Sequence, residues 1–196
     1  MSKVKNRKEF TEKLVLAAIF TALVIVLQLL GAFIRFGIFS ISLVLVPIIL
    51  GAALCGWKTG AWLGFVFGVA VLLSGDAAPF LAISVIGTVI TVLVKGTLCG
   101  AVAGILYELL QKKNSVFAAF SSAVVAPIVN TGVFLLGCSL FFLEEISNWG
   151  ASLGFNNTIA YMFLGLAGGN FIFELTVNII LVPVIIKVLS LTKKKL

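Results

Sequence analysis

The chain has 196 residues, of which 61% are hydrophobic and 11% are charged, and its mean hydropathy is +1.24. This composition excludes an ordinary water-soluble domain, because a core of this length could not hide so much apolar surface. The apolar runs are long and continuous and lack the alternation of a membrane β-barrel strand. We therefore predict an all-α membrane protein, a bundle of six transmembrane helices with both termini in the cytoplasm.

Polar breaks divide the chain into a basic N-terminus (residues 1–13), a single membrane domain (residues 14–191) and a basic tail (residues 192–196). The predicted spans are residues 14–34, 41–55, 60–73, 87–110, 115–142 and 158–191. The apolar run at residues 80–110 is too long for one upright span, so we expect either a tilted helix or a short re-entrant piece before the fourth span. A loop with Glu144, Glu145 and Trp149 precedes the last span.

Charges in the connections predict which side of the membrane each one faces, because cytoplasmic loops carry an excess of lysine and arginine. The segments expected inside hold the basic residues Lys3, Lys5, Arg7, Lys8, Lys13, Lys58, Lys112, Lys113, Lys193, Lys194 and Lys195. The segments expected outside hold Arg35, Asp76, Glu144 and Glu145. The net charge of +7 therefore indicates orientation in a bilayer with anionic lipid and requires no nucleic-acid partner.

Ionisable residues inside predicted spans are the sharpest functional signal, since a charge at the bilayer centre costs at least about 2.5–3.5 kcal/mol. Lys95 lies within the fourth span and Glu174 within the sixth. Asn170 and Asn178 stand four residues before and after Glu174, which places three polar groups on one helical face.

The pair Asn130 and Thr131 is a similar polar point midway along the fifth span. Together these six residues predict a polar pocket between helices that binds a small hydrophilic ligand. Structural alternatives stay open. Lys95 and Glu174 can pair with each other, or Lys95 can extend to an interface. Asn130 and Asn178 can form ordinary hydrogen bonds between helices.

Small residues at intervals of four form a second pattern, typical of helices whose backbones approach closely. For the glycines we expect internal packing, whereas the alanines, near the cytoplasmic end of the first span, equally suit docking of a partner protein. The residues are Ala18 and Ala22 in the first span, Gly64 and Gly68 in the third, and Gly96, Gly100 and Gly104 in the fourth.

Catalytic, cofactor and metal sites are not predicted. The chain has no histidine, and its three cysteines, Cys55, Cys99 and Cys138, stand singly in apolar segments. Residues 51–59 (GAALCGWKT) only approach a phosphate-binding loop, since Trp57 interrupts the motif and no strand precedes it. An intramembrane enzyme using a Ser/Lys dyad stays a remote alternative.

Several segments in order resemble the substrate-binding S components of energy-coupling factor (ECF) vitamin transporters. These are the basic N-terminus, residues 14–23 (LVLAAIFTAL), residues 39–51 (FSISLVLVPIILG) running into residues 56–60 (GWKTG), and the pair Asn130 and Thr131 after residues 124–127. The resemblance covers nearly the whole chain and is greatest to the branch with pantothenate transporters, although Lys95 stands where that branch would have an arginine.

The resemblance implies a multi-pass protein of a prokaryotic plasma membrane that captures a vitamin or related micronutrient from outside. Its pocket would be formed by the outward halves of spans four to six and the external loops. The resemblance also implies assembly with a transmembrane coupling protein and two cytoplasmic ATPases, and toppling of the S component to carry its pocket inward. Ala18 and Ala22 would correspond to the family's AxxxA surface for the coupling protein. We expect pantothenate ahead of riboflavin, folate or a modified base; a self-sufficient channel or facilitator is the alternative.

Overall fold

The computed structural model describes the backbone of residues 2–33, 35–36, 39–40 and 43–193, and the side chains of residues 7–32 and 43–192. Some residues of the predicted charge pattern lie outside these ranges: the side chains of Lys3, Lys5, Arg35 and Lys193, and Lys194 and Lys195 as a whole. The elements are α1 (Ser2–Phe33), β1 (Arg35–Phe36), β2 (Phe39–Ser40), α2 (Leu45–Cys55), α3 (Trp57–Ser74), α4 (Ala78–Leu81), α5 (Val85–Leu110), α6 (Ser115–Phe141), α7 (Leu143–Ser152), α8 (Thr158–Ala160), the π-helix η1 (Tyr161–Leu166) and α9 (Gly168–Lys193). The two short strands form an antiparallel pair, and the rest of the described fold is helical.

Five helices, α1, α3, α5, α6 and α9, are long and apolar enough to cross a bilayer. The second predicted span differs, because α2 has only 11 residues and therefore covers about 16 Å, roughly half of a hydrocarbon core. Residues 41–42 of that predicted span lie outside the described residues. All of α2 except Val46 and Cys55 is buried, so this helix is enclosed by the others.

Local backbone structure settles where the fourth span begins. The long apolar run at 80–110 is broken into α4 and α5, and Ser84 caps α5 by accepting a hydrogen bond from the Gly87 amide at 3.2 Å. The single tilted helix is thus wrong, and the short piece before the fourth span is confirmed.

The segment after α6 departs from prediction in two ways. Residues predicted as a loop form α7, whose first turn holds Glu144 and Glu145, where carboxylates interact favourably with the helix dipole. Residues 158–191 are not one helix either, because the chain passes through α8 and η1 before α9 begins at Gly168. The last span is therefore shorter than predicted.

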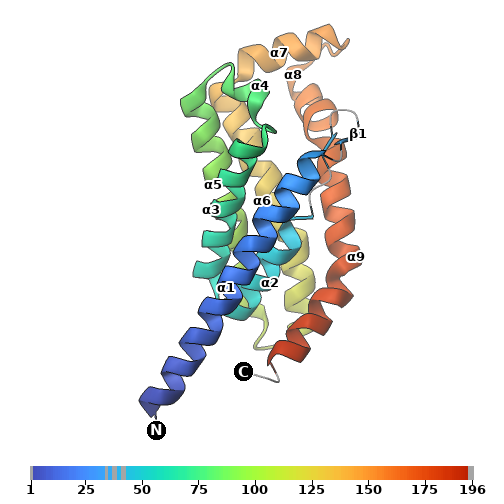
Figure 1. Cartoon of the computed structure of the whole chain (residues 1–196). Coiled ribbons are helices and arrows are strands. Elements are labelled where there is room, and N and C mark those ends of the chain that lie inside the picture. The colour runs from blue at the N-terminus through green and yellow to red at the C-terminus, as the bar shows by residue number, and fades with distance from the viewer. Residues whose placement is uncertain (1, 34, 37–38, 41–42, 194–196) are drawn as a thin grey trace.

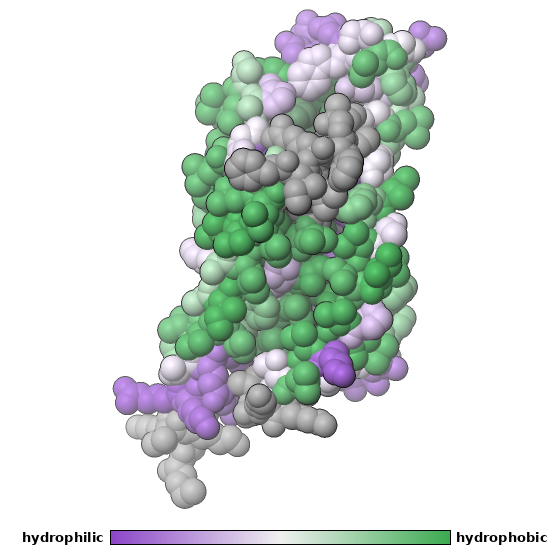
Figure 2. Space-filling view, turned by 45° about the vertical axis from the view of Figure 1, so that its right-hand side comes forward, coloured by the Kyte–Doolittle hydropathy of each residue, from purple (hydrophilic) through white to green (hydrophobic). Residues whose placement is uncertain are grey.

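The helices form one bundle with clearly different ends (Figure 1). At one end α1 begins, α2 turns into α3, α5 turns into α6, and α9 finishes; α4 and α7 lie at the other end. Hydrophobic side chains dominate the surface between hydrophilic ends, as Figure 2 shows for one face. This is the surface expected of a multi-pass membrane protein.

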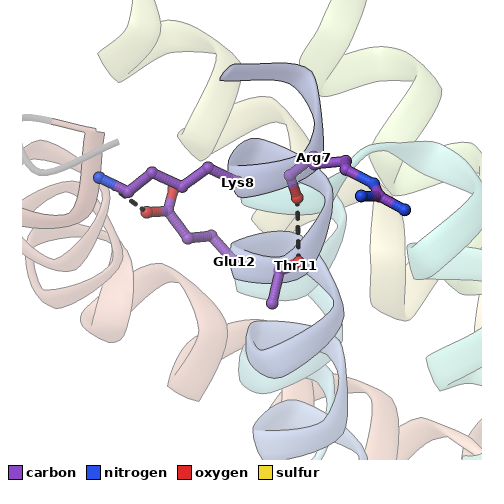
Figure 3. A network of polar contacts seen from close by, with 4 residues as sticks. All are labelled: Arg7, Lys8, Thr11 and Glu12. Carbon is purple, nitrogen blue, oxygen red and sulfur yellow. Dashed lines mark hydrogen bonds and ion pairs between the residues drawn. The ribbon is translucent and has the colours of Figure 1, made fainter. Parts of the chain in front are cut away.

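Polar contacts at the start of α1 continue the helix beyond the predicted span (Figure 3). Lys8 Nζ lies 3.8 Å from Glu12 Oε1, and the Thr11 hydroxyl donates a 2.9 Å hydrogen bond to the Arg7 carbonyl. Such exposed pairs at a spacing of four residues contribute only a few tenths of a kcal/mol, about 0.2–0.5. The basic N-terminus is therefore a polar extension of α1.

Glycines bring α3 and α5 into backbone contact, which confirms internal packing for these residues. A Cβ added to Gly64 would collide with the carbonyl oxygen of Gly96, and one added to Gly96 would collide with the carbonyl of Gly64. Gly60 and Gly100 have the same reciprocal relation one turn away. No other pair of helices is packed so extensively within the described fold.

Candidate functional site

A cavity of about 580 Å³ lies within the half of the bundle nearer α4 and α7. Its walls come from α1, α3, α4, α5, α6, α7, η1 and α9, so segments from nearly the whole chain meet there. The polar residues of the wall are Gln28, Asp76, Thr88, Thr91, Lys95, Asn130, Thr131, Asn170 and Glu174. A cavity of this size and mixed lining suits a small organic molecule.

Glu174 is the centre of a buried group of amides. The carboxylate is 2% exposed; its Oε2 accepts a hydrogen bond from Asn130 Nδ2 at 3.3 Å and its Oε1 accepts one from Asn170 Nδ2 at 3.4 Å. A carboxylate has about four acceptor sites, so these two bonds leave it with capacity for further donors. Asn178 Nδ2 donates at 2.9 Å to the backbone carbonyl of Glu174.

The same amides present unused acceptors. Because each turns its NH₂ group toward Glu174, its Oδ1 atom faces elsewhere, and Asn130 Oδ1 and Asn170 Oδ1 are buried without a hydrogen-bond partner within the described part of the chain. Thr91 Oγ1 on α5 is in the same condition. Buried polar atoms are nearly always hydrogen-bonded, and an unpaired one costs about 1–3 kcal/mol. All three residues line the cavity, so a ligand or water there could satisfy them.

Lys95, on α5, lines the same cavity. Its Nζ stands 5.1 Å from the ring centre of Phe134 and 5.8 Å from that of Phe67, within the range of cation–π attraction. Lys95 and Glu174 line the same cavity but are not within 4.0 Å of each other; the ion pair found within the described residues is Lys8–Glu12. Direct pairing of Lys95 with Glu174 is therefore absent, and the ammonium stays available to the cavity.

Aromatic rings form the wall near α4 and α7. The ring of Phe80 meets those of Phe134, Phe142 and Trp149 edge-on, with centroid distances of 5.5, 5.3 and 5.6 Å. Tyr161 of η1 completes this wall, and burial raises the pKa of its phenol. The wall supplies an apolar surface against which a flat or aliphatic part of a ligand can pack.

A polar contact joins α1 to the turn at the edge of the cavity. Gln28 Nε2 donates to Asp76 Oδ2 at 2.6 Å and lies 3.3 Å from Ser74 Oγ, which itself donates to Asp76 at 3.2 Å. Gly75, between Ser74 and Asp76, has φ +83°, a conformation that glycine adopts without strain. Asp76 is thus held in place at the cavity wall.

Comparison with protein families adds an independent result. The family model described as "ECF transporter, substrate-specific component" matches residues 12–186. The chain belongs to this family. No curated protein and no solved structure matches it.

The matched region of this ECF substrate-specific component includes every residue that lines the cavity. Membership of this family means that the protein takes part in transport across a membrane. It implies a small-molecule substrate and ECF coupling and ATPase partners. The polar cavity is accordingly the candidate substrate site.

Five of the six residues predicted from sequence to bind substrate meet at this cavity: Lys95, Asn130, Thr131, Asn170 and Glu174. Asn178, the sixth, is 2% exposed and does not line it. It lies one turn beyond Glu174 on the same face of α9, where its Nδ2 donates to the Glu174 backbone carbonyl. The sequence pattern correctly placed Asn178 on the same helical face as Glu174, but at that level along α9 the face does not line the cavity.

Other lining residues were not predicted as site residues. Thr88 and Thr91 carried no signal in a single sequence, because threonine in a membrane helix commonly bonds its own backbone, as Thr88 Oγ1 does to the Ser84 carbonyl at 2.7 Å. Phe80 and Trp149 looked like ordinary apolar or loop residues. Only packing of α4 and α7 over the cavity brings them to the site.

Ala18 and Ala22 lie away from the cavity on an exposed face of α1, opposite the buried residues Phe20, Val24 and Gln28. Their small side chains leave that face open to close approach by another helix.

Proposed function

We propose that this substrate-specific component captures a small water-soluble vitamin or related micronutrient in the cavity around Lys95 and Glu174. The observation that carries the proposal is one cavity with a cationic donor, a buried carboxylate and several unpaired acceptors, contributed by α5, α6 and α9. A cavity that only filled space between helices would have no reason to hold buried acceptors that lack a partner among the described residues, as Thr91, Asn130 and Asn170 do.

The arrangement of these groups favours a ligand with two chemically different ends. Lys95 suits a carboxylate or another electron-rich group, because an ammonium gives charge-assisted hydrogen bonds. Glu174, Asn130 and Asn170 suit hydroxyl or amine donors. Pantothenate has a carboxylate at one end and hydroxyls at the other, and we favour it over riboflavin, folate or a modified base.

In the proposed orientation the termini lie in the cytoplasm, so that the cavity half of the bundle faces outside. The positions of basic residues support this orientation, since Lys13, Lys58, Lys112 and Lys113 belong to the end at which α1 begins. In this topology α2 is the sixth membrane helix and reaches only part of the way across. The membrane would be the plasma membrane of a prokaryote.

Transport itself would depend on partners. We propose that Ala18 and Ala22 dock the coupling protein, that two cytoplasmic ATPases supply energy, and that the component topples to bring its cavity to the inner side. The exposure of both alanines on α1 supports their role in docking.

Native mass spectrometry of the purified protein tests the substrate assignment by identifying a co-purifying small molecule; pantothenate is the first compound to add back. Lys95→Ala and Glu174→Ala should each abolish detectable binding, whereas Lys187→Ala, an exposed lysine of α9 outside the cavity, should bind normally. Full binding by both cavity variants would contradict the site. Substrate flux through the purified chain alone in liposomes would contradict the dependence on partners and favour a facilitator.

A further inference from the structure

A second hollow lies at the opposite end of the bundle from the substrate cavity. It has a volume of about 920 Å³ and is formed by α1, the end of α2, the start of α3 and the end of α5 with its following turn. Neither the ECF family assignment nor the proposed substrate site accounts for it. Its lining divides into an apolar wall and a charged rim.

The apolar wall includes Leu54, Ile105 and Leu109. Ile105 is 41% exposed and Leu109 is 67% exposed, so this wall continues onto the outer surface of α5. In a bilayer such side chains face acyl chains. The hollow is therefore open toward the lipid on its apolar side.

The rim carries two exposed lysines from segments far apart in sequence, Lys13 of α1 and Lys112 of the turn after α5. Its acidic residue, Glu108, is already engaged, since Oε1 accepts the backbone N–H of Trp57 at 2.9 Å at the start of α3. Trp57 is 39% exposed, and tryptophan at this level is typical of the membrane interface. Neither lysine has an ion-pair partner among the described residues, so the rim offers positive charge at the depth of lipid headgroups.

We propose that this hollow binds an anionic phospholipid, with Lys13 and Lys112 at the phosphate and the acyl chains along Ile105 and Leu109. Charge complementarity selects the headgroup, and the continuous apolar wall selects a lipid over a free phosphate ion. The site joins α1 to the α2–α3 turn and to α5, so a bound lipid would hold these three segments together.

Cys55 provides a built-in reporter for occupancy. It lines the hollow and is partly exposed, and its Sγ lies 3.6 Å from the carbonyl oxygen of Lys13. The other described cysteines, Cys99 and Cys138, are fully buried and serve as internal references. The rate of Cys55 alkylation by N-ethylmaleimide can therefore be followed by mass spectrometry.

The experiment compares the purified full chain in nanodiscs of phosphatidylcholine alone and of an equal mixture with phosphatidylglycerol. We expect phosphatidylglycerol to slow Cys55 alkylation about fivefold or more, and the double variant Lys13→Ala/Lys112→Ala to lose that protection, since each lysine strengthens binding to anionic lipid about fivefold. The matched control Lys8→Ala/Lys113→Ala removes two basic residues at the same end of the bundle that do not line the hollow, and should keep the protection.

Equal protection of Cys55 in the unaltered protein and in both variants would mean that the anionic surface acts in general and not through this hollow. Equal loss of protection in both variants would mean that any basic residue at this end attracts the lipid. Either result overturns the site. Absence of protection in the unaltered protein also overturns it and leaves the hollow to a protein partner. Inorganic phosphate in phosphatidylcholine nanodiscs is the remaining arm. Protection by phosphate equal to that by the lipid would overturn the assignment to a phospholipid.

Discussion

Replacement of Glu174 by glutamine tests the substrate site with the smallest change in shape. The carboxylate accepts from Asn130 at 3.3 Å and from Asn170 at 3.4 Å, and it lies in the wall of the cavity. A glutamine keeps one acceptor oxygen and puts an NH₂ group in place of the other. Its amide can therefore retain only one of the two asparagine contacts and presents a donor where the ligand meets an acceptor.

The expected loss follows from the number of hydrogen bonds. A carboxylate has about four lone-pair sites, of which the two asparagines use two, so up to two remain for ligand donors. A hydrogen bond to a charged group contributes about 1.5–3 kcal/mol. Loss of one such bond raises Kd about 10- to 150-fold. The fold should lose little stability, because removal of the buried charge removes its desolvation cost and offsets the loss of one asparagine hydrogen bond.

Tryptophan fluorescence offers a direct assay. Trp149 lines the cavity, whereas Trp57 and Trp62 do not, so ligand binding should change the emission of Trp149. Titration with the co-purifying molecule, pantothenate first, yields Kd for the unaltered protein and for Glu174→Gln. Isothermal titration calorimetry measures the same constant without depending on Trp149, and thermal unfolding in detergent measures stability.

Asn178→Ala is the matched control for this prediction. Asn178 is as buried as Glu174 and bonds to its backbone, but it does not line the cavity. This variant should lower stability by about 1 kcal/mol and change Kd less than about threefold. An unchanged Kd for Glu174→Gln would refute the role of its carboxylate, and equal losses in both variants would mean that binding follows stability of α9 alone.

Three other variants test separate parts of the structure. Lys95→Met keeps the length of the side chain without its charge and should raise Kd for an anionic ligand at least about tenfold, while Lys187→Met, outside the cavity, leaves it unchanged in the same titration. Gly64→Leu should destabilise the fold by about 1–3 kcal/mol or more, because its Cβ would meet a backbone carbonyl of α5, whereas Gly132→Leu meets nothing within 4 Å and should unfold at nearly the normal temperature. Ala18→Trp should prevent co-purification with a coupling protein and preserve substrate binding; normal assembly would exclude this face of α1 from docking.

Features that depend on one helix at a time were predictable from the sequence. The long apolar runs located α3, α5 and α6, and the end of α1, within about three residues, because a membrane helix is defined mainly by its length and composition. The start of α1 was missed, since its first turns are polar. The spacing of Asn170 and Glu174 correctly put both on one face of α9. Breaks at Ser84 and η1 escaped clear prediction, since the same apolar composition continues across them.

Features that depend on several helices needed the structure. Asn178, which does not line the cavity, shows the reason, since helical periodicity specifies a face but not the depth at which neighbouring helices leave a space. Phe80 and Trp149 join the site only because α4 and α7 pack over it, and periodicity says nothing of such contacts.

By itself, the sequence determined that the chain enters a membrane, which connections carry positive charge, and which few polar residues would have to be shielded from lipid. These follow from the cost of placing each residue type in hydrocarbon, a property of the residue and its neighbours along one helix. Tertiary structure decided that Lys95 stays apart from Glu174, that α2 is only half a span, and that Asn130 and Asn170 keep oxygens at one cavity with no partner among the described residues. Those outcomes depend on distances between helices, which close packing of the whole bundle sets.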